Sequence, residues 1–98
     1  MRASNSDILT ADTLVYTGSC RIHALTVTFR LGAVGDFISI KDGTSVTGTT
    51  RLVVAAATAS QTYHFTWASG KEIAFNAGLF LNVGAGANVY VEIVYSST

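Results

Sequence analysis

The sequence predicts an all-β domain: a single antiparallel β-sandwich, jelly-roll-like, with about eight strands. Short segments rich in Val, Ile, Thr, Phe and Tyr recur along the chain and are separated by Gly, Asn, Asp and Ser. This composition is typical of antiparallel strands joined by turns. Helix signals are nearly absent, and several segments alternate between apolar and polar residues. A chain of 98 residues has room for one core.

The expected strands share this β-rich composition and are bounded by turn residues. In chain order they span residues 13–17, 20–31, 36–41, 50–55, 61–67, 71–75, 79–83 and 88–95. Asp42-Gly43 predicts a tight turn after the third strand, because glycine accepts the positive φ that such turns need. Gly70, Gly78 and the segment 84–88 separate the later strands in the same way.

The second strand contains a break in its pattern. Every other residue from Leu25 to Leu31 is apolar, so these side chains share one face. Ile22 is out of phase with them. A β-bulge or bend near His23 and Ala24 would reconcile the two halves of the strand.

Two later strands differ in how they should be covered. Tyr63, Phe65 and Trp67 alternate with polar residues and are expected to face the core. The last strand, 88–95, is substantially apolar on both faces. It is therefore expected to be central in its sheet or covered by a neighbour.

Residues 1–12 have the weakest strand pattern and are interpreted as an N-terminal arm whose order depends on a partner. Residues 13–98 form the β-sandwich domain. No tandem repeat, charge block or linker divides the chain.

The composition favours assembly over catalysis. Apolar residues make up 49% of the chain, charged residues only 12%, and the formal net charge is zero. An average soluble domain has about 25% charged residues, so exposed apolar surface is expected here, and such surface usually marks an interaction site. The six basic residues are scattered, which argues against nucleic acid or an anionic membrane as a partner.

The chain shows no secretory signal, and its longest apolar run, 52–57, is too short to cross a bilayer. Cys20 is the single cysteine, which excludes an internal disulfide and fits a reducing compartment. These features indicate synthesis in a cytoplasm.

Few residues are candidates for chemistry. Cys20 and His23 have a Cys-x-x-His spacing that His64 could approach, but a structural zinc site usually needs four ligands. The same residues are the only candidates for a Cys/His nucleophile pair. We interpret them as a small buried thiol and a histidine at a strand bend.

The carboxylates and glycines give no stronger signal. Asp36 and Asp42 flank one strand, and Glu72 and Glu92 lie on polar strand faces, so we interpret them as turn-capping or solvated groups. Gly84-x-Gly86 lacks the following helix of a dinucleotide fingerprint. The sequence therefore predicts no enzyme, no catalytic residue, no metal and no cofactor.

Aromatic residues are the remaining candidates, because an exposed Trp/Tyr row can stack on sugar rings. The pair Tyr63 and Trp67 would suit a glycan-binding module, although aromatic residues at alternating spacing are more often core. The full set is Phe37, Tyr63, Phe65, Trp67, Phe75, Phe80, Tyr90 and Tyr95. A flat threonine face, formed by Thr26, Thr28, Thr62 and Thr66, is interpreted as ordinary solvent-facing sheet.

Three segments resemble a group of small virion proteins of tailed bacteriophages. They are GSCRIH at 18–23, KDGT at 41–44, and FNAGL at 75–79 running into the closing Val/Tyr-rich strand. The resemblance covers about residues 13–95. Such proteins are small β-sandwiches, often jelly rolls, that decorate or cement phage heads, commonly as homotrimers, or occur in fibres and other virion parts.

The resemblance implies a head cement or decoration protein that is made in the host cytoplasm and lies on the capsid surface of the virion. Its implied partners are the major capsid protein and further copies of itself, as a homotrimer, with residues 1–12 as an anchoring arm. A phage tail or fibre component of the same fold is the alternative within the structural class. A small glycan-binding module is the alternative from a different class.

Overall fold

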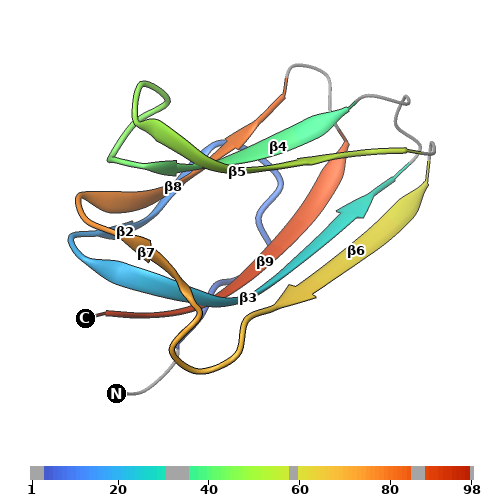
Figure 1. Ribbon diagram of the computed structural model, residues 1–98. Coiled ribbons are helices and arrows are strands. Elements are labelled where there is room, and N and C mark those ends of the chain that lie inside the picture. Colours follow the sequence, from blue (N-terminus) through green and yellow to red (C-terminus); the bar gives the residue numbers. More distant parts are fainter. Residues whose placement is uncertain (1–3, 31–35, 58–59, 85–87, 98) are drawn as a thin grey trace.

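The computed structural model describes residues 4–30, 36–57, 60–84 and 88–97, and confirms the predicted all-β sandwich (Figure 1). Two antiparallel sheets face each other. In chain order the strands are β1 (Ser4–Asn5), β2 (Thr13–Thr17), β3 (Cys20–Phe29), β4 (Phe37–Asp42), β5 (Thr49–Ala55), β6 (Gln61–Thr66), β7 (Ile73–Phe75), β8 (Gly78–Val83) and β9 (Val89–Ser97).

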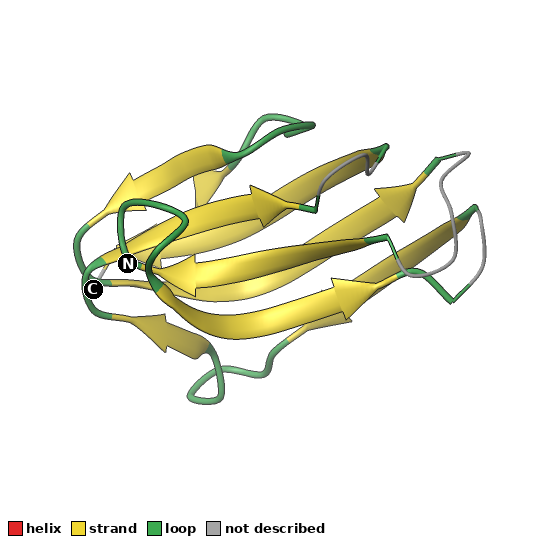
Figure 2. Ribbon diagram, turned by 90° about the horizontal axis from the view of Figure 1, so that it is seen from above, coloured by secondary structure: helices red, strands yellow, loops and turns green. Residues whose placement is uncertain are grey.

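The strand order is that of a jelly roll. The first sheet runs β1-β9-β3-β6, with β7 also paired to β3, and the second runs β2-β8-β4-β5. The chain therefore behaves as one long antiparallel ribbon, in which β1 pairs β9, β2 pairs β8, β3 pairs β6 and β7, and β4 pairs β5. Rolling this ribbon places successive pairs in alternate sheets. The strands run along the molecule and the turns gather at its ends (Figure 2).

The N-terminal segment supplies the first strand of the roll. Ser4 and Asn5 pair with Tyr95 and Val94 of β9, and Leu9 forms a further bridge to Val91. These contacts use backbone groups, which explains why the polar residues of β1 gave no strand signal in the sequence. The described part of the arm thus lies along its own domain. The domain boundary at residue 12 and the dependence of the arm on a partner stay predictions.

The predicted bulge in β3 is confirmed. The pairing of β3 with β9 shifts register between Ile22 and Ala24, which leaves His23 as the extra residue. Its carbonyl is not orphaned, because the Trp67 amide donates to it at 3.0 Å. The shift brings Ile22 and Leu25 onto the same inner face, where both are fully buried.

The core lies between the sheets and is drawn from nearly every strand. Its buried apolar members are Cys20, Ile22, Leu25, Val27, Phe29, Ile38, Ile40, Val54, Ala56, Phe75, Leu79, Leu81, Val89, Val91 and Ile93. β9 lies between β1 and β3, which confirms the predicted central position of the last strand. Leu31, predicted as the end of the second strand, lies outside the described residues.

Three glycines allow the backbone to pack closely at one end of the sandwich. A Cβ on Gly78 would lie 2.6 Å from the carbonyl oxygen of Gly43, and one on Gly48 would lie 2.7 Å from that of Asp42. The Gly43 amide donates to the Gly78 carbonyl at 3.2 Å. The turn after β4 and the start of β8 therefore touch through backbone atoms, with no space for a side chain.

We expect Gly78→Ala to lower the free energy of unfolding by about 1–3 kcal/mol, because a methyl group there collides with backbone that cannot rotate away. Gly70→Ala is the matched control: it meets nothing within 4 Å and is opposed only by its φ of 86°. Urea unfolding of both variants measures the difference. A smaller loss for Gly78→Ala than for Gly70→Ala would show that the close approach is easily relieved.

Candidate functional site

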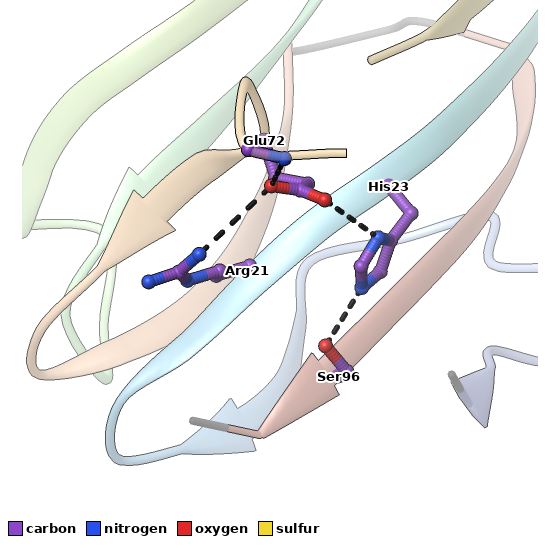
Figure 3. Close-up of polar contacts among 5 residues, drawn as sticks. Arg21, His23, Glu72 and Ser96 are labelled. Atoms are coloured by element: carbon purple, nitrogen blue, oxygen red, sulfur yellow. Dashed lines mark hydrogen bonds and ion pairs between the residues drawn. The ribbon is translucent and has the colours of Figure 1, made fainter. Parts of the chain in front are cut away.

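The most connected polar group in the described part of the chain lies around His23 (Figure 3). The His23 Nε2 atom lies 2.7 Å from the hydroxyl of Ser96 on β9, and Nδ1 lies 3.6 Å from Oε2 of Glu72. The bulge turns the His23 side chain between these two partners. Arg21 completes the cluster, with its guanidinium 3.9 Å from Oε1 of Glu72.

Glu72 is held at this point by the loop that precedes β7. The Gly70 amide donates to Glu72 Oε1 at 2.9 Å, and the side chain of Glu72 is 8% exposed. A hydrogen bond from the amide of Glu72 itself lowers the pKa of its carboxyl, burial opposes this, and the Gly70 amide and the charges of His23 and Arg21 lower it further. The carboxylate is therefore ionised at neutral pH and lies within ion-pair distance of Arg21 and His23.

Serine, histidine and carboxylate in series are the groups of a hydrolase triad, in which the histidine removes the serine proton. That chemistry also requires a substrate carbonyl to reach the serine and donors to bind the oxyanion. Ser96 is only 4% exposed, and the three surface grooves described for this molecule are lined by other residues. The arrangement suits a structural role: it links the bulge of β3 to the end of β9 and to the loop before β7.

The proposed metal and nucleophile candidates do not meet. Cys20 is fully buried in the core, and burial together with the charge of Asp42 raises the pKa of its thiol to about 11. His64 lies on the outer side of β6, where Nδ1 is 2.7 Å from the Thr26 hydroxyl. Within the described residues no group of three or more His, Cys, Asp or Glu side chains is arranged to hold a metal ion.

Asp42 holds the β7–β8 turn against the end of β4. Its carboxylate accepts the Asn76 amide at 3.1 Å and the Ala77 amide at 2.9 Å. Partial burial opposes ionisation, but the amides of Ala77, Asn76 and Gly78 and the charge of Arg51 outweigh it and lower the pKa of Asp42. The interpretation of Asp42 as a turn-capping group is thereby made specific: it caps a turn 34 residues further along the chain.

The other carboxylates occupy separate places. Asp36 precedes β4, and its carbonyl accepts the Ala56 amide at 2.7 Å. Glu92 lies on β9 opposite Thr26 and lines a shallow groove of about 180 Å³ with Ile8 and Tyr90. Gly86, of the Gly84-x-Gly86 motif, lies outside the described residues.

Tyr63 and Phe65 of β6 and Trp67, which follows it, form a row along the inner face at the margin of the sandwich. Tyr63 and Phe65 are stacked with centroids 6.4 Å apart, and Phe65 and Trp67 with centroids 6.3 Å apart. Tyr63 and Trp67 pack against the core, whereas Phe65 is 37% exposed. The prediction that this face is buried is therefore wrong for Phe65, because β6 is an edge strand and the sandwich is open beside it.

Sugar stacking needs a free ring face, and these rings are turned toward one another. The Tyr63 hydroxyl is also engaged: it accepts the Ala57 amide at 3.0 Å and donates to Gln61 at 2.7 Å. The other aromatic candidates are dispersed: Phe75 lies in the core, Tyr95 packs against it beside Tyr16, and Tyr90 lies on the outer face of the first sheet under the Arg30 guanidinium. No common aromatic platform joins them.

The two outer faces of the sandwich differ in character. The first sheet carries the threonine face, in which Thr28 bonds Thr62 at 3.1 Å and Thr26 bonds His64. On the outer side of the second sheet, Leu14, Phe37, Val53, Ala55 and Phe80 form what we call the apolar outer face, and the polar residues Ser39, Lys41 and Asn82 lie among them. Among these, Leu14 is 43% exposed, Phe37 39% and Val53 54%.

Sequence reasoning expected exposed apolar surface but did not locate it. Val53 and Phe37 alternate with the core residues Val54 and Ile38, so both faces of β4 and β5 are apolar in places. Only the pairing of the four strands of the second sheet shows which members lie outside. The role of Ser96 was also missed, because no local pattern connects it with residues more than 20 positions away.

No protein-family model matches the chain, and no curated protein matches it. Among solved structures, it is similar to a chain in the virus-like particle of the extra small virus of the giant freshwater prawn Macrobrachium rosenbergii. The TM-score is 0.41 and the identity 8%, over 100% of this chain and 81% of that chain. At these values the likeness carries no conclusion about function. The described residues include no helix that is long and apolar enough to cross a membrane.

We expect Asp42→Asn to lower stability near neutral pH and to reduce its dependence on acid. The pKa of Asp42 is lower in the folded than in the unfolded chain, so its carboxylate stabilises the fold above the ordinary value of 3.8. That contribution is lost as the pH falls through the folded pKa. Urea unfolding of both proteins from pH 7 to pH 3 should give a difference that shrinks at the acidic end. A constant difference would show that the charge of Asp42 does not matter.

We expect Ser96→Ala to lower the free energy of unfolding by about 1 kcal/mol, because the buried His23 contact loses its partner. Ser97→Ala, at the exposed neighbouring position, should leave stability unchanged. The wild type and both variants, tested for hydrolysis of p-nitrophenyl acetate, should show equal background rates. A rate that depends on Ser96 would instead identify it as a nucleophile.

Proposed function

We propose that this protein is a structural component of a virion, of the head cement type found in tailed bacteriophages. The apolar outer face of the second sheet is the observation that supports this most directly. Its members Leu14, Phe37 and Val53 are exposed in the isolated chain, and the other side of the same sheet faces the core. Charged side chains keep protein surfaces solvated and separate, and they make up only 12% of this chain. Association with a partner is therefore favoured.

The geometry of this face suits a contact with a shell. Leu14 pairs with Phe80 across β2 and β8, and Phe37 pairs with Ala55 across β4 and β5, so apolar side chains reach both margins of the sheet. Burial of such a surface stabilises a complex by about 25 cal/mol for each Å² of apolar area, before association costs. Many copies on one shell would add weak contacts through effective concentration.

The major capsid protein is the partner that this proposal assigns to the apolar outer face. The polar threonine face would then point toward solvent, on the outside of the particle. Residues 4–12 lie along β9 of the first sheet. To act as the anchoring arm that the resemblance implies, this segment would have to leave β9 when the chain binds the shell.

The test is co-sedimentation of the purified chain with empty heads of the phage that encodes it, prepared without this protein. The chain should bind the heads, and Val53→Asp should weaken binding at least about tenfold, because a charge enters the apolar contact. Ala74→Asp, an exposed alanine-to-aspartate change on β7 of the other sheet, is the matched control and should bind normally.

Two results would overturn this proposal. Binding to tails and not to heads would assign the chain to the tail or fibre. Loss of binding in Ala74→Asp but not in Val53→Asp would place the contact on the first sheet.

A further inference from the structure

Among the residues that the structure describes, β6 has no strand partner on the side away from β3, and this free edge lacks the features by which sheet edges usually avoid pairing with other chains (Figure 1). The edges formed by β1, β2 and β5 have such features, and β7, which pairs only with β3 in the described part of the chain, is three residues long. β1 is two residues long, β2 has a register shift between Leu14 and Tyr16, and β5 is shifted opposite β4 with Arg51 at the irregularity. β6 pairs with β3 over six residues without a shift and contains no charged residue, proline or glycine.

The hydrogen bonds to β3 show which backbone groups of β6 face outward. The Trp67 amide donates to the His23 carbonyl on β3. In an antiparallel sheet, each residue directs its amide and its carbonyl toward the same neighbouring strand, and successive residues alternate between the two neighbours. Phe65 and Tyr63 therefore bond β3 as Trp67 does, whereas Thr62, His64 and Thr66 direct their amides and carbonyls to the free edge.

Thr62 and Thr66 lie two residues before and two residues after His64. Because the outward groups are placed symmetrically about His64, the edge is complementary to a copy of itself. We propose that two copies of this chain associate through β6, antiparallel and about a two-fold axis at His64. The His64 backbones then bond each other, and Thr62 bonds Thr66 of the second copy in both directions. Every outward amide of β6 gains a carbonyl, and the first sheets of the two copies become continuous.

The side chains agree with this register. Residues directly opposite each other in a β-pair lie on the same face, so Tyr63 faces Phe65 of the second copy in a non-hydrogen-bonded pair, where side chains approach most closely. The half-exposed Phe65 ring is thereby covered from the side on which the sandwich is open. On the outer face, Thr62 meets Thr66 of the second copy and the two His64 imidazoles lie opposite each other at the axis, while no carboxylate or ammonium group opposes another.

This inference goes beyond the proposed function, since it concerns the contact between copies and not the shell that they bind. It also competes with the homotrimer implied by the sequence resemblance, because a two-fold contact builds dimers and even-numbered assemblies. The mass of the full chain in solution separates the two. Light scattering over a dilution series should give a dimer that dissociates reversibly, and a trimer or a monomer at all concentrations would overturn the inference.

His64→Pro tests the contact directly, because proline removes the central amide that faces outward and leaves the bonds to β3 in place. It should be monomeric at concentrations where the wild type is dimeric. His64→Ala keeps the amide and should remain dimeric. Circular dichroism and thermal unfolding establish that both variants are folded, and a dimer of folded His64→Pro would contradict the proposed edge.

Disulfide cross-linking tests the register without relying on proline. Residues of a hydrogen-bonded pair have Cα atoms about 5.5 Å apart, so His64→Cys should form a covalent dimer under mild oxidation. In the same register, position 66 lies four residues, about 13 Å, from position 66 of the second copy. Thr66→Cys alone should therefore stay uncross-linked, whereas a mixture of Thr62→Cys and Thr66→Cys chains should cross-link. Efficient cross-linking by Thr66→Cys alone, or none by His64→Cys, would overturn the register.

Discussion

The extra residue at His23 is the constraint on which the rest of this sandwich depends. A strand shows alternate faces, so without a bulge Ile22 and the set from Leu25 onward would point to opposite sides of the first sheet. The bulge places both in the core and also divides β3 between two partners, β7 before it and β6 after it. Contacts from His23 to Ser96 and Glu72 then fix the bulge from both sides.

The turn between β4 and β5 packs against the start of β8 through backbone atoms and not through side chains. Gly43, Gly48 and Gly78 bring the turn after β4 against the start of β8, and the Asp42 carboxylate bonds the amides of the β7–β8 turn. At both His23 and Asp42, polar side chains bond an irregular part of the backbone. The contacts at both points hold strands and turns of the fold together.

Those surfaces have three distinct characters. The second sheet has an apolar outer face, the first sheet has a threonine face whose hydroxyls bond one another, and β6 has an uncharged free edge. The contact with a shell that we propose requires area, which the apolar outer face would provide. A contact between copies requires complementarity, which the edge provides through its backbone. The two contacts can coexist because they use different sides of the sandwich.

The sequence alone determined the strand-rich fold, eight of the strands to within a few residues, and the bulge, because these follow from alternation and turn chemistry within a few neighbouring residues. Its low charge and lack of convergent catalytic residues also indicated an assembly role, which stays a prediction. The tertiary structure alone decided that residues 4–5 form a strand, that Ser96 meets His23, that Asp42 caps a distant turn, and that Phe65 is exposed at an open edge. Each of these depends on which strands become neighbours, and that order is set by long-range pairing for which a local pattern carries no information.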